Sequence, residues 1–148
     1  MTPIETQLQR FLASPAFGVA GASTSRDKYG NKVLRCYLQR GRRAVPVHPR
    51  EAAIEGVRCV ASVAELPPEV KSLSIITPPA ITEQVVEQAI SRGIENVWMQ
   101  PGAESARAIA RCREAGVNVI GDGTCVLVVL GYHDGWVPAG GEAPSGGR

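Results

Sequence analysis

Short, continuous apolar runs alternate with helix-like segments along most of this chain. We predict strands over 17–22, 43–48, 72–77, 96–100 and 118–121, and helices over 4–12, 31–40, 81–91 and 104–115. The strands are largely continuous apolar runs rather than alternating ones, which is typical of parallel strands that are buried on both faces. Because strand–helix–strand units cross over with one hand, the order predicts an α/β fold, a doubly wound parallel sheet of about five strands with helices on both faces.

The length of 148 residues suits one domain with a single core. We predict a leading helix within 1–13, a domain over 14–131 and a tail over 132–148. A short strand-like insert at 57–60 and one turn of helix at 62–66 fall inside the domain. The tail contains Pro138, Pro144 and several glycines without periodicity, so we expect it to be disordered.

Charge and composition exclude several classes of protein. The net charge is only +2 and no basic stripe with aromatic residues is present, so we expect no nucleic-acid binding. No apolar run approaches the roughly 20 residues of a membrane helix, and Glu5 and Arg10 interrupt the start as they would not in a signal peptide. The four cysteines form no Cys-x-x-Cys pair, and His48 and His133 lie far apart, so we expect reduced thiols and no metal site. These features predict a cytoplasmic protein.

The end of the first predicted strand has the composition of a phosphate-binding turn. The apolar run stops at Gly21, and Ala22, Ser23 and Thr24 follow before the next helix. A glycine lets backbone approach a phosphate, and a helix N-terminus offers free N–H groups and the positive end of its dipole. Similar turns also join strands to helices with no ligand, so that alternative stays open.

The segment between this turn and Gly30 is longer and more charged than a dinucleotide fingerprint, which places its third glycine about three residues after the second. Arg26 and Lys28 lie in it and could reach a pyrophosphate. The alternative is a solvated, charged loop.

In an open parallel sheet, ligands bind at the carboxyl ends of the strands. These ends carry small, polar and proline residues in this chain, a pattern that turn chemistry alone also produces. The segments are Gly21 to Ser23, His48 to Arg50, Thr77 to Pro79, Met99 to Gly102 and Gly121 to Gly123.

The second strand end discriminates between cofactors. An NAD site needs an acidic residue there to bind the ribose hydroxyl. The chain instead has His48, Pro49 and Arg50, and the nearest acid, Glu51, lies beyond the proline. Arginine suits a phosphate monoester, so the tip favours NADP or coenzyme A, both of which carry an extra ribose phosphate. The alternative is that Arg50 is a solvated loop charge.

Four segments of the chain resemble a known family. They are Val19-Ala20-Gly21-Ala22-Ser23, Ala44-Val45-Pro46-Val47-His48-Pro49-Arg50 with Glu55-Gly56, Ser62-Val63-Ala64-Glu65-Leu66-Pro67, and Val97-Trp98-Met99-Gln100-Pro101-Gly102. Over residues 12–125 the chain is similar to the CoA-binding domain proteins, small stand-alone relatives of the N-terminal domain of the succinyl-CoA ligase α-subunit. The resemblance implies a Rossmann-like fold with CoA along the strand ends. It also implies that Gly21 to Thr24 hold the phosphates, that Arg50 takes the place of the family's basic residue after the second strand, and that Ile76 to Pro78 contact another part of CoA.

Two departures from the family pattern bear on function. Many stand-alone members have an Asp-Arg-Cys-x-Lys-like segment after the fifth strand, whereas this chain reads Asp122-Gly123-Thr124-Cys125-Val126-Leu127 and lacks the basic residues. The ligases carry a phosphorylated histidine in a second domain, which we do not find here. A nucleophile also needs a base within reach, and neither histidine has an evident partner.

We therefore predict a non-catalytic CoA-binding or acyl-CoA-binding protein with no catalytic residues. An NADP-linked oxidoreductase is one alternative, although few residues follow the fifth strand. The other is a CoA-binding subunit of an acyl-CoA ligase whose catalytic parts lie on a partner subunit; a homo-oligomer is also left open. The predicted cofactor-binding residues are Gly21, Ala22, Ser23, Thr24, Arg26, Lys28, His48, Pro49, Arg50, Ile76, Thr77, Pro78, Gln100 and Pro101.

Overall fold

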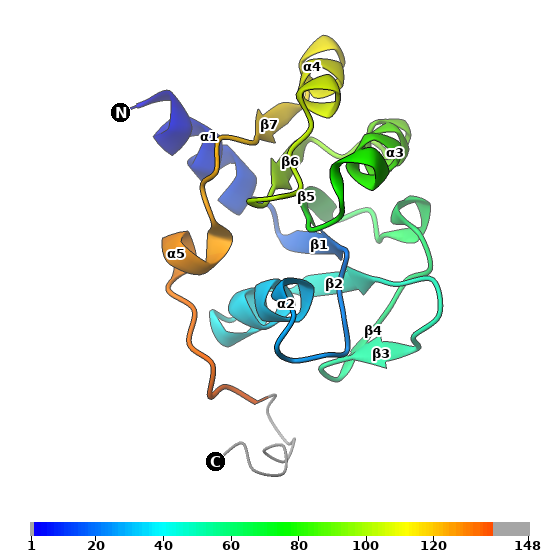
Figure 1. Cartoon of the computed structure of the whole chain (residues 1–148), viewed down its shortest axis with the longest axis vertical. Coiled ribbons are helices and arrows are strands. Elements are labelled where there is room, and N and C mark those ends of the chain that lie inside the picture. Colours follow the sequence, from blue (N-terminus) through cyan, green and yellow to red (C-terminus); the bar gives the residue numbers. More distant parts are fainter. Residues whose placement is uncertain (1, 138–148) are drawn as a thin grey trace.

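The computed structural model describes residues 2–137, which form a five-stranded parallel sheet in the order β2-β1-β5-β6-β7 (Figure 1). The strands are β1 (Ala16–Ala20), β2 (Ala44–Val47), β5 (Val70–Ile75), β6 (Asn96–Met99) and β7 (Asn118–Ile120). The doubly wound parallel sheet that the sequence predicts is therefore confirmed.

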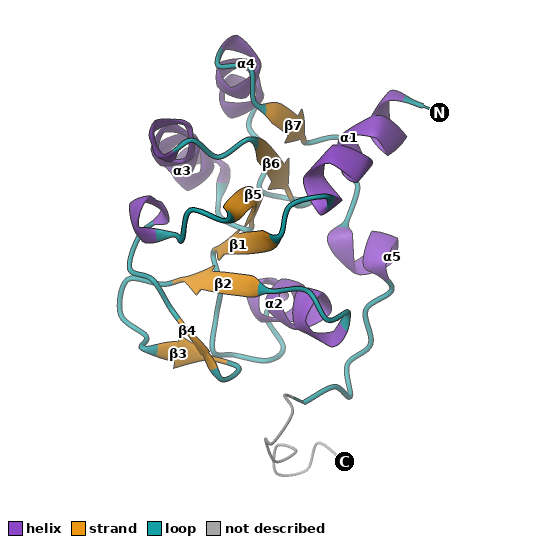
Figure 2. Ribbon diagram, turned by 180° about the vertical axis from the view of Figure 1, so that it is seen from behind, coloured by secondary structure: helices purple, strands orange, loops and turns teal. Residues whose placement is uncertain are grey.

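Helices cover both faces of the sheet (Figures 1 and 2). On one face lie α3 (Pro79–Arg92), α4 (Ala106–Glu114) and the 3-10 helix η1 (Val63–Glu65), whose residues join one apolar cluster. On the other face lie α1 (Pro3–Leu12), α2 (Tyr29–Gln39) and α5 (Val126–Leu130), which join the second cluster. No helix within residues 2–137 combines the length and apolar character needed to cross a membrane.

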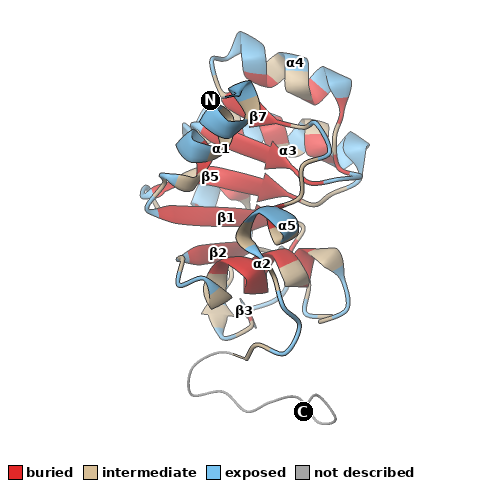
Figure 3. Cartoon of the chain, turned by 90° about the vertical axis from the view of Figure 1, so that its left-hand side faces the viewer, coloured by how far each residue is buried: buried red, intermediate tan, exposed pale blue. Residues whose placement is uncertain are grey.

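Burial on both faces explains why most of the strands are apolar without alternation, whereas in β5 serines alternate with Leu73 and Ile75 (Figure 3). Along β6, Val97 and Met99 join the cluster under α3 and α4, while Trp98 points to the opposite cluster. The serines of β5 point toward the α1 and α2 side, where Ser72 donates to the carbonyl oxygen of Phe11 at 2.7 Å and Ser74 pairs with the Tyr37 hydroxyl at 2.6 Å. These hydrogen bonds let polar side chains occupy a buried face.

The helix ends differ in how they are capped. Thr2 and Glu5 form a capping box at α1, and Ser105 accepts a hydrogen bond from the Ala108 N–H at α4. The N-cap of α2 is Lys28, whose side chain makes no capping hydrogen bond within the described residues. The first turn of α2 therefore keeps N–H groups that a ligand could bind.

Three details differ from the sequence-based expectation. The insert predicted at 57–60 is an antiparallel hairpin of β3 (Ala53–Ile54) and β4 (Val57–Arg58), after which Val60 pairs with Val47 beside β2 (Figure 2). The first strand ends at Ala20 because Gly21 turns the chain with φ +96°. Helix α5 was not expected, because a five-residue apolar run is too short to show helical periodicity. Of the predicted tail, residues 132–137 lie against α2, and 138–148 are outside the described residues.

Candidate cofactor-binding site

A cleft of about 430 Å³ opens at the carboxyl ends of β1, β2 and β5. It lies at the topological switch point, because the chain leaves β1 through α2 toward β2 on one side and later returns to β5 on the other side of β1. The lining residues are Ala20, Gly21, Ala22, Val47, His48, Pro49, Ala61, Ser62, Val63, Thr77, Ile81, Val85 and Gln88.

Two glycines let α2 begin next to the end of β1. A Cβ atom on Gly21 would lie 2.1 Å from the backbone oxygen of Ile76, and one on Gly30 would lie 1.9 Å from the backbone oxygen of Gly21. Both contacts are with the protein's own backbone, so packing alone requires these glycines. The glycine at the end of the first strand is thus explained without a ligand.

The β1–α2 loop, residues 21–28, is held by local polar contacts. Ser23 Oγ accepts a hydrogen bond from the Ser25 N–H at 3.1 Å, and Asn31 Nδ2 donates to the Ser23 carbonyl oxygen at 2.8 Å. Ser25 also donates to Asp27, and this hydrogen bond lowers the pKa of the Asp27 carboxyl. Thr24 and Lys28 are exposed on the same loop.

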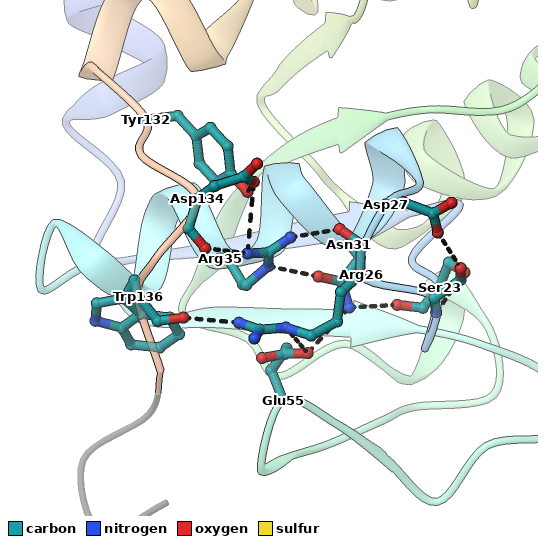
Figure 4. Close-up of polar contacts among 10 residues, drawn as sticks. Ser23, Arg26, Asp27, Asn31, Arg35, Glu55, Tyr132, Asp134 and Trp136 are labelled. Atoms are coloured by element: carbon teal, nitrogen blue, oxygen red, sulfur yellow. Dashed lines mark hydrogen bonds and ion pairs between the residues drawn. The ribbon is translucent and has the colours of Figure 1, made fainter. Parts of the chain in front are cut away.

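Arg26 is engaged by other parts of the protein (Figure 4). Its Nε lies 3.3 Å from a Glu55 carboxylate oxygen, and its Nη2 donates to the carbonyl oxygen of Trp136 at 2.7 Å. The side chain does not line the cleft. Arg26, predicted to contact a phosphate, is therefore already engaged by two partners within the protein.

His48 closes the turn after β2. Its Nδ1 accepts hydrogen bonds from the backbone N–H groups of Arg50 and Glu51, each at 3.0 Å. A ring nitrogen that accepts carries no proton, so the neutral imidazole has its proton on Nε2, on the other side of the ring. His48 and Pro49 line the cleft, while Arg50 is exposed on the adjoining turn.

The opposite wall comes from β5 and α3. Thr77 lines the cleft and pairs with the Thr82 hydroxyl at 2.7 Å, while Ile76 and Pro78 flank it. Ile81, Val85 and Gln88 face the cleft from successive turns of α3, and Ile81 is 42% exposed. Sequence reasoning missed these three, although their helical spacing after Pro78-Pro79 was a usable signal.

Gln100 and Pro101 are at the end of β6, which β5 separates from β1. Gln100 is fully buried, and its Oε1 accepts hydrogen bonds from the Val126 N–H at 2.9 Å and the Tyr29 hydroxyl at 3.3 Å. These bonds join the start of α2 to the start of α5. Pro101 is exposed, and neither residue lines the cleft.

Asp122 lies at the end of β7, and its carboxylate accepts a hydrogen bond from the Thr124 N–H at 3.0 Å. This bonding to Thr124 lowers the pKa of Asp122. The contact is that of an Asp-Gly turn rather than of a general base. Within residues 2–137, no three His, Cys, Asp or Glu side chains gather closely enough to hold a metal ion.

The sheet order and the cleft define a Rossmann-like α/β domain with its candidate site at the switch point. The model of the CoA binding domain family matches residues 16–131, and the chain therefore belongs to that family. The family predicted from the sequence is confirmed.

Relatives and solved structures agree with this assignment. The α-subunit of acetate–CoA ligase (ADP-forming) II from Pyrococcus furiosus is 30% identical over 91 residues, 61% of this chain. The chain spans only 20% of that relative's length. A conserved hypothetical protein from Pyrococcus furiosus is 37% identical with a TM-score of 0.74, covering 77% of this chain and 97% of that one. A hypothetical protein from Pyrococcus horikoshii OT3 is 25% identical with a TM-score of 0.79, covering 86% and 89% respectively.

Proposed function

We propose that this protein binds CoA or an acyl-CoA in the cleft and does not catalyse a reaction by itself. The observation that carries the proposal is the cleft at the β1–β5 switch point, which is lined by Gly21 and Ala22, at the start of the loop that leads to the uncapped N-terminus of α2, and by His48 and Pro49, which precede Arg50. A helix N-terminus and an exposed guanidinium are two separate places for the phosphates of one ligand.

The pyrophosphate is proposed to bind at Gly21 to Thr24, with the first N–H groups of α2 and the exposed Lys28 nearby. The 3′-phosphate is proposed to bind Arg50. Glu51, the nearest acid, lies beyond Pro49 rather than at the tip of β2, where an NAD site would need its ribose-binding carboxylate. His48 is proposed to donate a hydrogen bond from its Nε2–H to the ligand, since its Nδ1 is already an acceptor for the turn.

The adenine is proposed to pack against Ile81 and Val85, whose apolar side chains form one wall of the cleft. An exposed isoleucine at the mouth of a cleft gains by contact with a planar base. Ile76 to Pro78 would then meet the pantetheine arm, with Gln100 and Pro101 beyond them at the next strand end. Arg26 would not contact the pyrophosphate directly; it would favour pyrophosphate binding only by holding the loop in place.

The absence of catalysis is argued from the two candidate acid–base residues, His48 in the cleft and Asp122 at the distant end of β7. His48 Nδ1 is occupied by two N–H groups, and Asp122 is used in a turn. A second candidate function is that of a CoA-binding subunit of an acyl-CoA ligase, with catalysis on a partner subunit. The similarity to an acetate–CoA ligase α-subunit favours it.

Titration calorimetry with CoA, dephospho-CoA, NADP and NAD tests the proposal. We expect CoA to bind most tightly, because it alone combines the 3′-phosphate with the pantetheine arm. Tighter binding of NADP would indicate the oxidoreductase alternative, and equal affinity for CoA and dephospho-CoA would remove the 3′-phosphate contact. Native mass spectrometry of the purified protein would identify a co-purified acyl-CoA.

A further inference from the structure

The chain that follows α5 returns along α2 to the β1–α2 loop (Figure 4). We call residues 131–137 the C-terminal strap. Gln39 of α2 exchanges two hydrogen bonds with the backbone of His133 in the strap, at 2.8 and 2.9 Å. Farther along, Asp134 and Trp136 lie beside Arg35 and Arg26. The strap thus contacts both α2 and the loop that precedes it.

Arg35 is the centre of these contacts and is only 2% exposed. Its guanidinium donates to Asn31 Oδ1 at 2.6 Å, to the carbonyl oxygen of Asp134 at 3.0 Å and to the carbonyl oxygen of Arg26. The Tyr132 ring stacks on the guanidinium, with its centroid 5.5 Å from Arg35 Cζ. A buried charge is tolerated only when its donors are paired, so Arg35 holds α2, the strap and the loop together.

The same contacts extend into the loop itself. The Asn31 amide that Arg35 orients donates from its Nδ2 to the Ser23 carbonyl oxygen at 2.8 Å and to Glu55 at 3.1 Å. Glu55 in turn pairs with Arg26 and has φ +51°, a left-handed conformation that is strained for a non-glycine residue. The turn of the β3–β4 hairpin is therefore held against the loop by Arg26 and Asn31 (Figure 4).

We propose that Arg35, together with the C-terminal strap, positions the β1–α2 loop for the ligand's phosphates, although neither lines the cleft. Arg35 is a positioning residue, because it acts through Arg26 and Asn31. The planar guanidinium of arginine donates hydrogen bonds to α2, the strap and the loop at once, which a lysine ammonium cannot do in the same geometry. A loop ordered by the protein's own contacts binds phosphate without a further loss of conformational freedom.

The first test needs no ligand. Amide hydrogen exchange is measured by NMR for Ser25 and Lys28, whose N–H groups donate to Ser23 Oγ and to the Ser25 carbonyl oxygen, in the wild type and in the variants Arg35→Met, Arg35→Lys and Tyr132→Ala. We expect exchange of these amides to rise about tenfold in both Arg35 variants and less in Tyr132→Ala, with the β1 and β5 amides unchanged. Arg42→Met is the matched control, since Arg42 also donates to a backbone oxygen and stacks on a ring but contacts neither strap nor loop. If Arg35→Met does not fold, the other two variants decide; unchanged loop exchange in folded variants would overturn the proposal.

The second test rests on the proposed function. Well below the melting temperature, Arg35→Lys and Arg35→Met should weaken CoA and dephospho-CoA to the same extent, about tenfold, because both ligands carry the pyrophosphate. Faster loop exchange with unchanged CoA affinity would overturn the link between the strap and the site. If the wild type binds no CoA, the proposed function fails, and the exchange measurement still decides the positioning role.

Discussion

The two loops that border the cleft differ in how they are held. The β1–α2 loop is fixed by the Asn31 amide, by the close backbone packing at Gly21 and Gly30, and by contacts with Glu55, Arg35 and the carbonyl oxygen of Trp136. The turn after β2 is fixed chiefly by one imidazole nitrogen, and Arg50 extends from it into solvent. One loop offers a preformed backbone surface, and the other offers a charge on a long side chain. A ligand with two separate phosphate groups would use both.

The largest expected effect is on folding, at Gly21. Gly21→Ala places a Cβ atom 2.1 Å from the Ile76 oxygen at a positive φ, so we expect a loss of about 2–5 kcal/mol in the free energy of unfolding. Gly41→Ala is the control, because Gly41 also has a positive φ but no atom lies within 4 Å of its Cβ position; we expect about 1–2 kcal/mol there. Urea denaturation measures both. Equal losses would show that the backbone contact with Ile76 is unimportant.

On the other loop, Arg50→Ala should leave stability unchanged and weaken CoA binding by roughly 1.5–3 kcal/mol, the range for a charge-assisted hydrogen bond. Salt should weaken the wild type more than the variant. Arg58→Ala, which removes another exposed arginine, on β4, is the control for net charge. A dissociation constant shared by Arg50→Ala and the wild type would identify Arg50 as a solvated loop charge.

A smaller effect is expected at His48, where two substitutions separate its two nitrogens. His48→Asn keeps an acceptor near the Nδ1 position, so the turn should persist while CoA binding weakens by about 0.5–1.5 kcal/mol. His48→Gln keeps a donor near the Nε2 position and removes the acceptor of the turn, so it should loosen the amides of Arg50 and Glu51. Calorimetry and NMR measure these outcomes, and nitrogen-15 shifts of the wild-type ring report the tautomer. Unaltered CoA affinity in a folded His48→Asn would remove His48 from the ligand contacts.

The last prediction is that neither loop supports catalysis. Incubated alone with labelled ATP or GTP, the protein should stay unphosphorylated, and with CoA and a carboxylic acid it should form no acyl-CoA. The physical reason is that His48 uses Nδ1 for the turn and no second histidine lines the cleft. Labelling that disappears in His48→Gln would instead make this protein a catalytic subunit.

The sequence by itself determined the order and type of the main elements, because these depend on local periodicity and on residues that end helices and strands. Gly93 ends α3 in a left-handed conformation, and burial on both faces gave most of the strands a largely apolar sequence (Figure 3). The sequence did not predict the short α5 or the pairing of β3 with β4, since neither element is long enough to show a period.

Only the tertiary structure decided which strand ends share a cleft, because the order β2-β1-β5-β6-β7 depends on contacts between distant segments. It places Gly21, Ala22, His48, Pro49 and Thr77 together and sets Gln100 and Pro101 apart from them. It also gives Arg26 two partners, one of them Trp136, that no local pattern could reveal. Periodicity acts over a few residues, whereas the pairing of a loop with a strap more than one hundred residues away is selected by the packing of the whole domain.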